Sequence, residues 1–219
     1  GFIDAVGEKV DQTLVGQHCV AENVLSDGGE VGFQHAGAYG EYFLTEATNI
    51  HLLPDGFPLT TATLIEPLAV VTRALKRLRL DEHSQILISG DGPIGLLTLL
   101  CLKIKGIPEV IMIGGRAGRL ELARSFGAAE TFDVGHQSTP LATRLQQYFG
   151  MPPSCIIEAS GSAIALETAL QILDRKGQML LIGDYGQSNA RFPWNTLIHR
   201  EIELMGSNAG AGAWAEAVQ

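Results

Sequence analysis

One stretch of the sequence decides the fold: Gln85-Ile86-Leu87-Ile88-Ser89-Gly90-Asp91-Gly92-Pro93-Ile94-Gly95. Its apolar first half is typical of a buried parallel strand, and the GxGxxG pattern that follows opens a helix with Pro93 near the first-turn position. That arrangement would aim free backbone N–H groups and the positive end of the helix dipole at a diphosphate. Glycine supplies 26 of the 219 residues, so the pattern alone is weak and an ordinary glycine-rich turn is the alternative. The strand before it and the helix after it favour a phosphate-binding loop.

Each glycine of this loop has a separate predicted role. Gly90 would make the tight turn, Gly92 would let a diphosphate approach the backbone, and Gly95 would let the helix pack closely on the strand. A carboxylate beside a diphosphate is unfavourable, so Asp91 fits only if its side chain points away. The predicted diphosphate-binding residues are Gly90, Gly92, Pro93, Ile94 and Gly95.

The chain from Gln85 to about Gly206 alternates apolar strands with helices, which predicts a parallel sheet covered on both faces. We therefore expect an α/β fold, a doubly wound parallel sheet of Rossmann type. The expected strands are residues 85–89, 109–113, 130–132, 155–158, 178–182 and 202–205. Helices are expected at residues 93–105, 118–126, 140–149 and 163–173, and a helix at 61–78 would lead into this part.

The chain before Pro54 has short β-like runs separated by glycines, which predicts an all-β piece. The expected runs are residues 2–6, 14–20, 38–45 and 50–53. Both ends look cut, because Gly1 begins within a strand-like run and Gln219 stops within the first turns of a helix. We therefore expect the middle portion of a larger protein.

The composition argues against several classes of partner. A chain with 46% hydrophobic and 18% charged residues is globular, and its net charge of -9 argues against DNA or RNA, whose binding needs clustered Lys and Arg. No run is long enough to span a bilayer and no export leader is apparent, so we expect no membrane partner. The three cysteines, Cys19, Cys101 and Cys155, form no CxxC pair, which fits a reducing cytoplasm.

The end of the second expected strand bears on the choice of dinucleotide. A site that prefers NAD would place Asp or Glu there to accept hydrogen bonds from the ribose hydroxyls. The sequence has Gly114-Gly115-Arg116 instead. The glycines would leave room and exposed N–H groups for a 2′-phosphate, and Arg116 and Arg119 would offer cationic donors to it. This favours NADP(H), with NAD(H) and solvated arginines as the alternative.

Several segments together resemble the zinc-dependent medium-chain dehydrogenases, with the sorbitol, threonine and glucose dehydrogenase branches nearest. Residues 1–7 and 38–43 resemble segments of that family's GroES-like β domain, which carries the catalytic zinc. The other matching segments are Leu64-Ile65-Glu66-Pro67-Leu68-Ala69, Gly90 to Leu97, Arg119-Leu120-Glu121-Leu122-Ala123, Gly127-Ala128 and Ile157-Glu158-Ala159-Ser160-Gly161-Ser162.

The resemblance implies four parts of the chain. Residues 1–60 would be part of a GroES-like all-β catalytic domain, 61–84 a connecting helix, 85–206 the Rossmann dinucleotide-binding domain, and 207–219 the start of the return to the catalytic domain. Two segments at the carboxyl edge of the sheet would then flank the nicotinamide ribose, Ala159-Ser160-Gly161 and Gly183-Asp184-Tyr185.

The family holds the substrate oxygen on zinc while hydride passes to or from the nicotinamide. Of its metal-site residues only Glu66 can be carried over, as the catalytic residue that holds Zn²⁺ or a zinc-bound water, with a helix-surface carboxylate as the alternative. The Cys and His ligands expected upstream would lie before residue 1. The family's four-cysteine lobe for a structural zinc has no counterpart between Asn23 and Ala38, so this branch lacks the lobe or residues are missing there.

The histidines show no metal-ligand spacing, and we interpret them as loop, surface or packing residues. They are His18, His35, His51, His83, His136 and His199.

We therefore expect an NADP-linked, zinc-dependent dehydrogenase of a small alcohol, polyol or sugar. The resemblance implies a homo-oligomer, either a dimer or a tetramer. Two alternatives stay open at this point: a zinc-free NADPH reductase of the quinone-reductase kind, against which Glu66 counts, and a non-catalytic dinucleotide sensor.

Overall fold

The computed structural model describes residues 1–135, 139–189 and 192–219, and the chain divides into two compact units. The first unit comprises Gly1–Val70 and Ala209–Gln219, and the second comprises Val71–Asn208. Within the described ranges, no helix is both long and apolar enough to cross a lipid bilayer. The three cysteines are free thiols, and burial raises the pKa of Cys155 to about 12.

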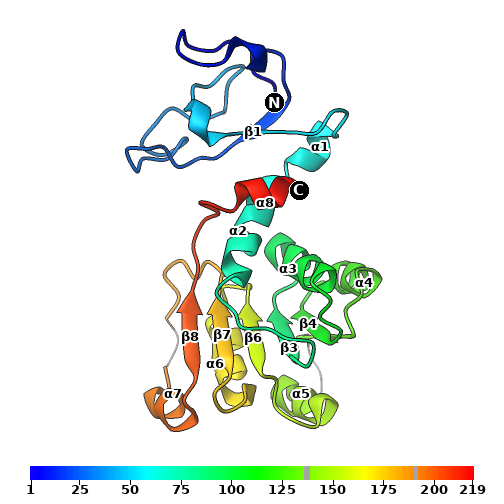
Figure 1. Ribbon diagram of the computed structural model, residues 1–219. Coiled ribbons are helices and arrows are strands. Elements are labelled where there is room, and N and C mark those ends of the chain that lie inside the picture. The colour runs from blue at the N-terminus through cyan, green and yellow to red at the C-terminus, as the bar shows by residue number, and fades with distance from the viewer. Residues whose placement is uncertain (136–138, 190–191) are drawn as a thin grey trace. The chain divides into compact units, whose positions relative to one another are not determined.

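The second unit is built on a sheet of six strands in the order β5-β4-β3-β6-β7-β8, and every neighbouring pair is parallel (Figure 1). This is the strand order of the doubly wound dinucleotide-binding sheet, so the predicted fold class is confirmed. The strands are β3 (Ile86–Ser89), β4 (Val110–Gly114), β5 (Glu130–Asp133), β6 (Cys155–Glu158), β7 (Gln178–Leu181) and β8 (Glu203–Gly206).

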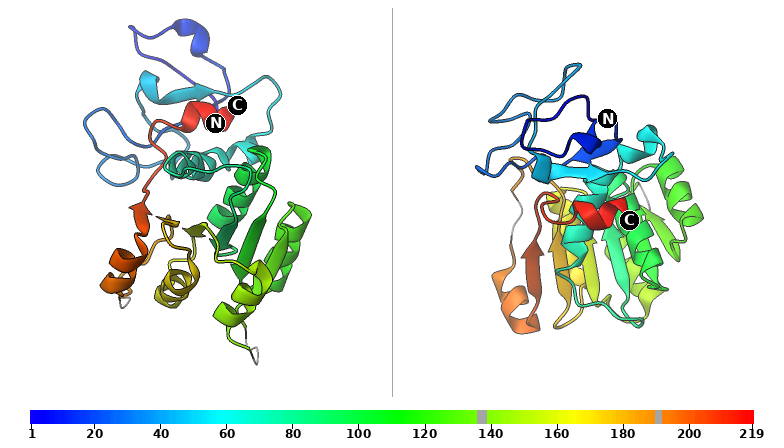
Figure 2. Two further views of the ribbon diagram at one scale, coloured as in Figure 1. Left: turned by 60° about the horizontal axis from the view of Figure 1, so that its bottom comes forward. Right: turned by 45° about the horizontal axis from the view of Figure 1, so that its top comes forward.

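Helices cover both faces of this sheet (Figure 2), because side chains of each strand alternate between two cores. Ile86 and Ile88 of β3 lie in one core with side chains of α2, α3 and α4, whereas Leu87 lies in the other core with side chains of α5, α6 and α7. Full burial of one such side chain contributes about 1.5–3 kcal/mol to folding. The helices of this unit are α3 (Pro93–Ile104), α4 (Ala117–Ser125), α5 (Leu141–Phe149), α6 (Ala163–Ile172) and α7 (Trp194–Arg200), with the end of α2 (Ile65–Leu75).

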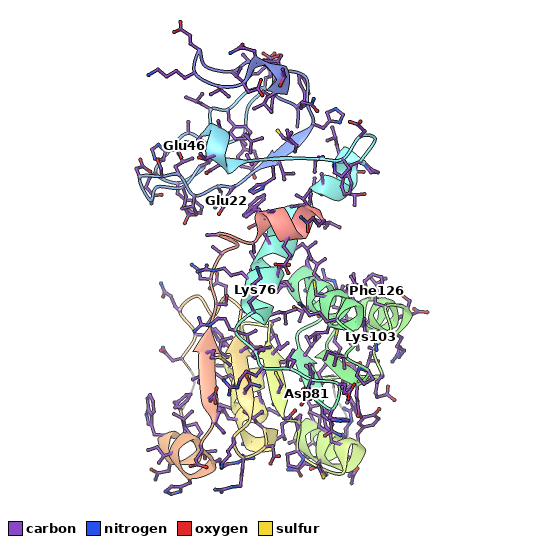
Figure 3. The ribbon with its side chains drawn as sticks, viewed as in Figure 1. Glu22, Glu46, Lys76, Asp81, Lys103 and Phe126 are labelled. Atoms are coloured by element: carbon purple, nitrogen blue, oxygen red, sulfur yellow. The ribbon has the colours of Figure 1, made fainter. Side chains whose placement is uncertain are left out.

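The predicted strands and four of these helices are confirmed to within a few residues at their ends. Helix α7 was not predicted, because it is seven residues long and its N-cap, Pro193, makes no side-chain capping bond. Polar side chains also hold loops between elements. Lys103, labelled in Figure 3, donates through its Nζ to the carbonyl oxygens of Ile107 at 3.2 Å and Pro108 at 3.0 Å, which holds the connection from α3 to β4.

The first unit contains an antiparallel pair of strands, β1 (Cys19–Ala21) and β2 (Ile50–Leu52). Long loops surround the pair, and carboxylates fix them: Glu46 accepts hydrogen bonds from the Ser26 backbone N–H at 3.1 Å and from its hydroxyl at 2.6 Å (Figure 3). The remaining elements are the 3₁₀ turns η1 (Gln12–Leu14) and η2 (Ala47–Asn49), the helices α1 (Leu59–Ala62) and α8 (Trp214–Val218), and the start of α2. Their apolar core includes Leu53, Ala62, Ile65, Ala69 and Trp214.

Four predictions for this unit were wrong in detail. Residues 38–45 form no strand, and of residues 2–6 only Phe2 forms a β-bridge, an isolated one to His18. Of residues 14–20, only Cys19 and Val20 lie in a strand. The helix expected at 61–78 is two helices, α1 and α2. Pro67 explains the break, because it has no N–H to donate to the carbonyl four residues earlier and is tolerated only in the first turn of a helix.

The close packing of α3 on β3 gives a test of the fold. Substituting Gly95→Ala would place a methyl group against the carbonyl oxygen of Gly90 and close to the Ile88 side chain, both of which are held by the sheet. We expect it to lower the free energy of unfolding by about 1–3 kcal/mol, the usual cost of overpacking.

Gly118→Ala is the matched control, since Gly118 also lies in a helix and a methyl group there meets no atom within 4 Å. It should leave stability unchanged or raise it by up to about 1 kcal/mol. Denaturant unfolding followed by circular dichroism measures both, and equal effects of the two substitutions would contradict the packing seen at Gly95.

Candidate functional site

The centre of the sheet is the point at which the strand order reverses. β3 lies between β4 and β6, and the carboxyl ends of these strands meet at one edge of the sheet (Figure 1). The loop after β3 and the loop after β6 are in contact there, because a Cβ on Gly90 would lie 2.8 Å from the Ser160 nitrogen. Open α/β sheets bind ligands in the crevice outside such a reversal point.

The geometry of the glycine loop fits a diphosphate. Gly90 has a φ of +121°, a conformation that favours glycine, and Gly95 packs on the carbonyl of Gly90. A Cβ on Gly92 would meet nothing within 4 Å, so space is open beside the loop. Helix α3 begins at Pro93, directly after Gly92, and the amide groups of its first turn have no intrahelical acceptor. Open space beside free amides at a helix N-terminus is an anion-binding arrangement.

Asp91 turns toward the end of β4. Its Oδ2 accepts hydrogen bonds from the backbone N–H groups of Gly115 at 3.1 Å and Arg116 at 2.8 Å, and its Oδ1 lies 3.8 Å from Arg116 Nη1. The expectation that these N–H groups would be exposed is therefore wrong, because the Asp91 carboxylate already occupies them. Asp91 is 7% exposed, whereas the side chain of Arg116 is 67% exposed and faces solvent.

Gly114 makes this approach of Asp91 possible. A Cβ on Gly114 would lie 2.7 Å from Asp91 Oδ2, closer than side-chain atoms approach one another. Arg119 lies in the first turn of α4, three residues after the N-cap Arg116, and is half-buried. The structure therefore brings the glycine loop and both predicted arginines to the same end of β3 and β4.

The segments 159–161 and 183–185 are joined by a buried carboxylate that the sequence interpretation gave no role. Glu158 is fully buried, and its oxygens accept hydrogen bonds from the backbone N–H groups of Ser160 at 2.9 Å and Gly161 at 3.2 Å. The hydroxyl groups of Ser160 and Tyr185 donate to it as well, that of Tyr185 at 2.6 Å. Glu158 thus connects the loops after β6 and β7.

This contact shapes the protonation of Tyr185. Burial, the hydrogen bond to Glu158 and the negative charge of Glu158 together raise the pKa of the Tyr185 hydroxyl well above its usual range. Tyr185 therefore remains a neutral hydrogen-bond donor at physiological pH. Gly183 packs against the Gly161 nitrogen, so the segments 159–161 and 183–185 are in direct contact.

A signal for Glu158 was present in the sequence. A carboxylate that ends an otherwise apolar strand, with serine two residues later, indicates a buried charge that needs donors. Asp91 carried a similar signal, since its place in the loop required the side chain to turn away from the diphosphate.

The first unit contains a largely apolar cavity of about 860 Å³ whose lining includes Glu66, Cys19, Glu41 and Trp214. Glu66 lies in the first turn of α2. Its side chain is exposed in the cavity, yet the walls around it exclude enough water to raise the pKa of the carboxyl. A cation bound beside Glu66 would favour its ionised form.

The chain does not complete a metal site around Glu66. Among the residues that the structure describes, no group of three or more His, Cys, Asp and Glu side chains could hold a metal ion. His35 pairs with Asp27 at 2.9 Å and His51 lies 3.7 Å from Glu22, while His136 falls outside the described residues. The residues present therefore do not by themselves fit a zinc ion.

Comparison with known proteins agrees with the geometry of the second unit. The chain is 27% identical over 227 residues to galactitol 1-phosphate 5-dehydrogenase of Escherichia coli strain K12, and the match covers 94% of this chain but 65% of that protein. The chain therefore spans less than two thirds of the length of this relative.

Two solved structures have the same fold. A protein from Escherichia coli CFT073 described as a short chain alcohol dehydrogenase, in complex with NADH, superposes with a TM-score of 0.91 at 24% identity and covers 100% of this chain and 68% of its own. A protein of Sinorhizobium meliloti 1021 described as a zinc-binding dehydrogenase, bound to NADP, superposes with a TM-score of 0.89 at 19% identity; the match covers 100% of this chain and 69% of that chain.

The family model described as zinc-binding dehydrogenase matches residues 93–219, from the first turn of α3 to the last residue of the chain. This stretch is more than half of the chain and includes Arg116 and Tyr185, in the segments after β4 and β7, and Glu158 at the end of β6. The chain belongs to the zinc-binding dehydrogenase family.

Proposed function

We propose that this chain belongs to an oxidoreductase that transfers hydride between NADP(H) and a small alcohol, polyol or sugar. The observation that carries the proposal is the glycine loop at the reversal point of the sheet, with open space beside Gly92 and the first turn of α3 behind it. Family membership and a curated relative that acts on a polyol phosphate support the reaction class and the substrate class.

The second unit would bind the dinucleotide along the carboxyl edge of its sheet. Amide groups of the loop from Gly90 to Gly95 would hold the diphosphate, and Arg116 and Arg119 would pair with a 2′-phosphate of the adenosine half. The segments 159–161 and 183–185 would flank the nicotinamide ribose. When bound, the nicotinamide supplies or accepts the hydride, and the role of these residues is to orient it and exclude water.

The first unit would hold the reacting end of the substrate. Glu66 is the one residue of this chain that we assign to a zinc site, to which it would contribute a carboxylate; the described residues do not supply the remaining ligands. The largely apolar cavity beside it has room for a small polyol and would shield the reaction from solvent. We further propose a cytoplasmic homo-oligomer that contacts neither membrane nor nucleic acid. The curated relative supports neither of the two alternatives, the zinc-free reductase and the non-catalytic sensor.

Arg116→Ala tests the assignment of NADP(H). We expect the Kd for NADPH to rise about tenfold, because a charge-assisted hydrogen bond contributes about 1.5–3 kcal/mol, while the Kd for NADH changes by less than about twofold. Isothermal titration calorimetry with each dinucleotide measures both constants. Arg124→Ala, which removes an exposed arginine from the last turn of the same helix, is the control and should change neither. Equal weakening of both dinucleotides by Arg116→Ala would rule out the role of Arg116.

Glu66→Gln tests the assignment of the cavity. We expect the turnover of a polyol to fall at least about tenfold, the low end of what the loss of a residue that supports a metal site costs. The Kd for NADPH should not change, because the loop that holds the dinucleotide lies in the other unit. Glu8→Gln removes an exposed carboxylate from the same unit as Glu66 and serves as the control. Unchanged turnover and unchanged zinc content per chain in the Glu66 variant would remove Glu66 from the proposed site.

A further inference from the structure

Asp91 presents an arrangement that the proposed binding mode leaves unused. Its carboxylate is buried in the middle of a loop that would hold an anionic diphosphate, where a negative charge is unfavourable. Its hydrogen-bond and charge partners among the described residues lie at the end of β4, in the backbone N–H groups of Gly115 and Arg116 and the guanidinium of Arg116. The carboxylate is therefore an anion bound by that end of the strand.

The same end of the strand is where this fold recognises the adenosine ribose. Two backbone N–H groups directed at one oxygen, with a guanidinium 3.8 Å from the other, form a site that would also suit a phosphate oxygen. A 2′-phosphate and the Asp91 carboxylate would compete for these donors and would repel each other. A 2′-hydroxyl carries no charge and can donate a hydrogen bond to a carboxylate.

Gly114 shows that the arrangement depends on the local sequence. Any other residue at position 114 would place its Cβ 2.7 Å from Asp91 Oδ2 and displace the carboxylate. Gly114 thus stands where an acidic residue is usual at the end of β4, and it leaves the space that the Asp91 carboxylate of the neighbouring loop occupies.

We propose that Asp91 is a specificity-determining residue, an internal anion that competes with the 2′-phosphate for the Gly115 and Arg116 donors and thereby limits the preference for NADP(H) over NAD(H). This inference rests on the proposed function, since it assumes that the second unit binds a nicotinamide dinucleotide. It adds that Arg116 is shared between Asp91 and the cofactor, so that the site accepts both dinucleotides.

The Asp91→Asn substitution separates the charge from the shape. Asparagine keeps an oxygen that can accept from both N–H groups but removes the negative charge. We expect the ratio of the Kd for NADH to the Kd for NADPH to rise about tenfold, the order of effect of one unit charge acting a few ångströms away at a protein surface. Calorimetric titration of the purified protein with each dinucleotide gives the ratio without any measurement of turnover.

Two further variants test whether a change in this ratio comes from the Asp91 carboxylate at the strand end. Asp81→Asn removes the same charge from the turn before β3, where Asp81 accepts from the His83 N–H and the Ser84 hydroxyl, and it should leave the ratio unchanged. Gly114→Ala keeps the Asp91 charge but displaces the carboxylate from the strand end, so it should raise the ratio in the same direction. It keeps the test decisive if Asp91→Asn does not fold.

The outcomes distinguish the inference from the proposed function. If the ratio of the Kd for NADH to the Kd for NADPH stays constant in Asp91→Asn and Gly114→Ala, the role of Asp91 is overturned, even where both affinities change by one common factor. That outcome would leave the oxidoreductase proposal intact. A wild-type protein that binds neither dinucleotide would instead overturn the proposed function itself.

Discussion

The arrangement of the site depends on one close approach, that of the α3 backbone at Gly95 to the carbonyl of Gly90. Because no side chain separates them, the helix begins directly beside the end of β3 and its first-turn amides face the open space at Gly92. The same turn brings Gly90 against the loop after β6, so the adenosine and nicotinamide sides of the proposed site are positioned from one point. A methyl group at Gly95 would move the helix, and with it every group that the helix orients.

Two buried carboxylates fix the loops around the end of β3. Hydrogen bonds from backbone amides and hydroxyl groups, more than salt bridges, satisfy both of them. Asp91 accepts from amides at the end of β4, and Glu158 accepts from amides of its own loop and from Tyr185. Burying an ionised group is costly unless several hydrogen bonds compensate, so each carboxylate holds its loop in the one geometry that supplies them. Rigid loops at a strand edge reduce the ordering cost of binding a long, flexible ligand.

The sequence predicted the second unit better than the first, for reasons that particular residues show. Ile86 to Ile88 are apolar without interruption because a central parallel strand is buried on both faces, and that pattern survives any tertiary context. Residues 38–45 include aromatic side chains, which are typical of a strand, yet Tyr39 and Tyr42 are exposed and belong to no β-strand. The contacts of Asp91 and Glu158 could not be predicted, because their partners lie on other strands or depend on how loops turn.

Gly114 shows how the lack of a carboxylate at one position can be misinterpreted from the sequence alone. A missing carboxylate at the end of β4 predicts a strand end open to a phosphate, but the missing side chain is also what lets Asp91 enter from the next loop. The electrostatic potential at the strand end is set by the charge that lies there, whichever strand supplies it. If the second unit binds a nicotinamide dinucleotide as proposed, its preference would follow from the summed charge of Asp91, Arg116 and Arg119 and from which backbone amides remain free. The identity of residue 114 would matter through the space that it leaves for Asp91.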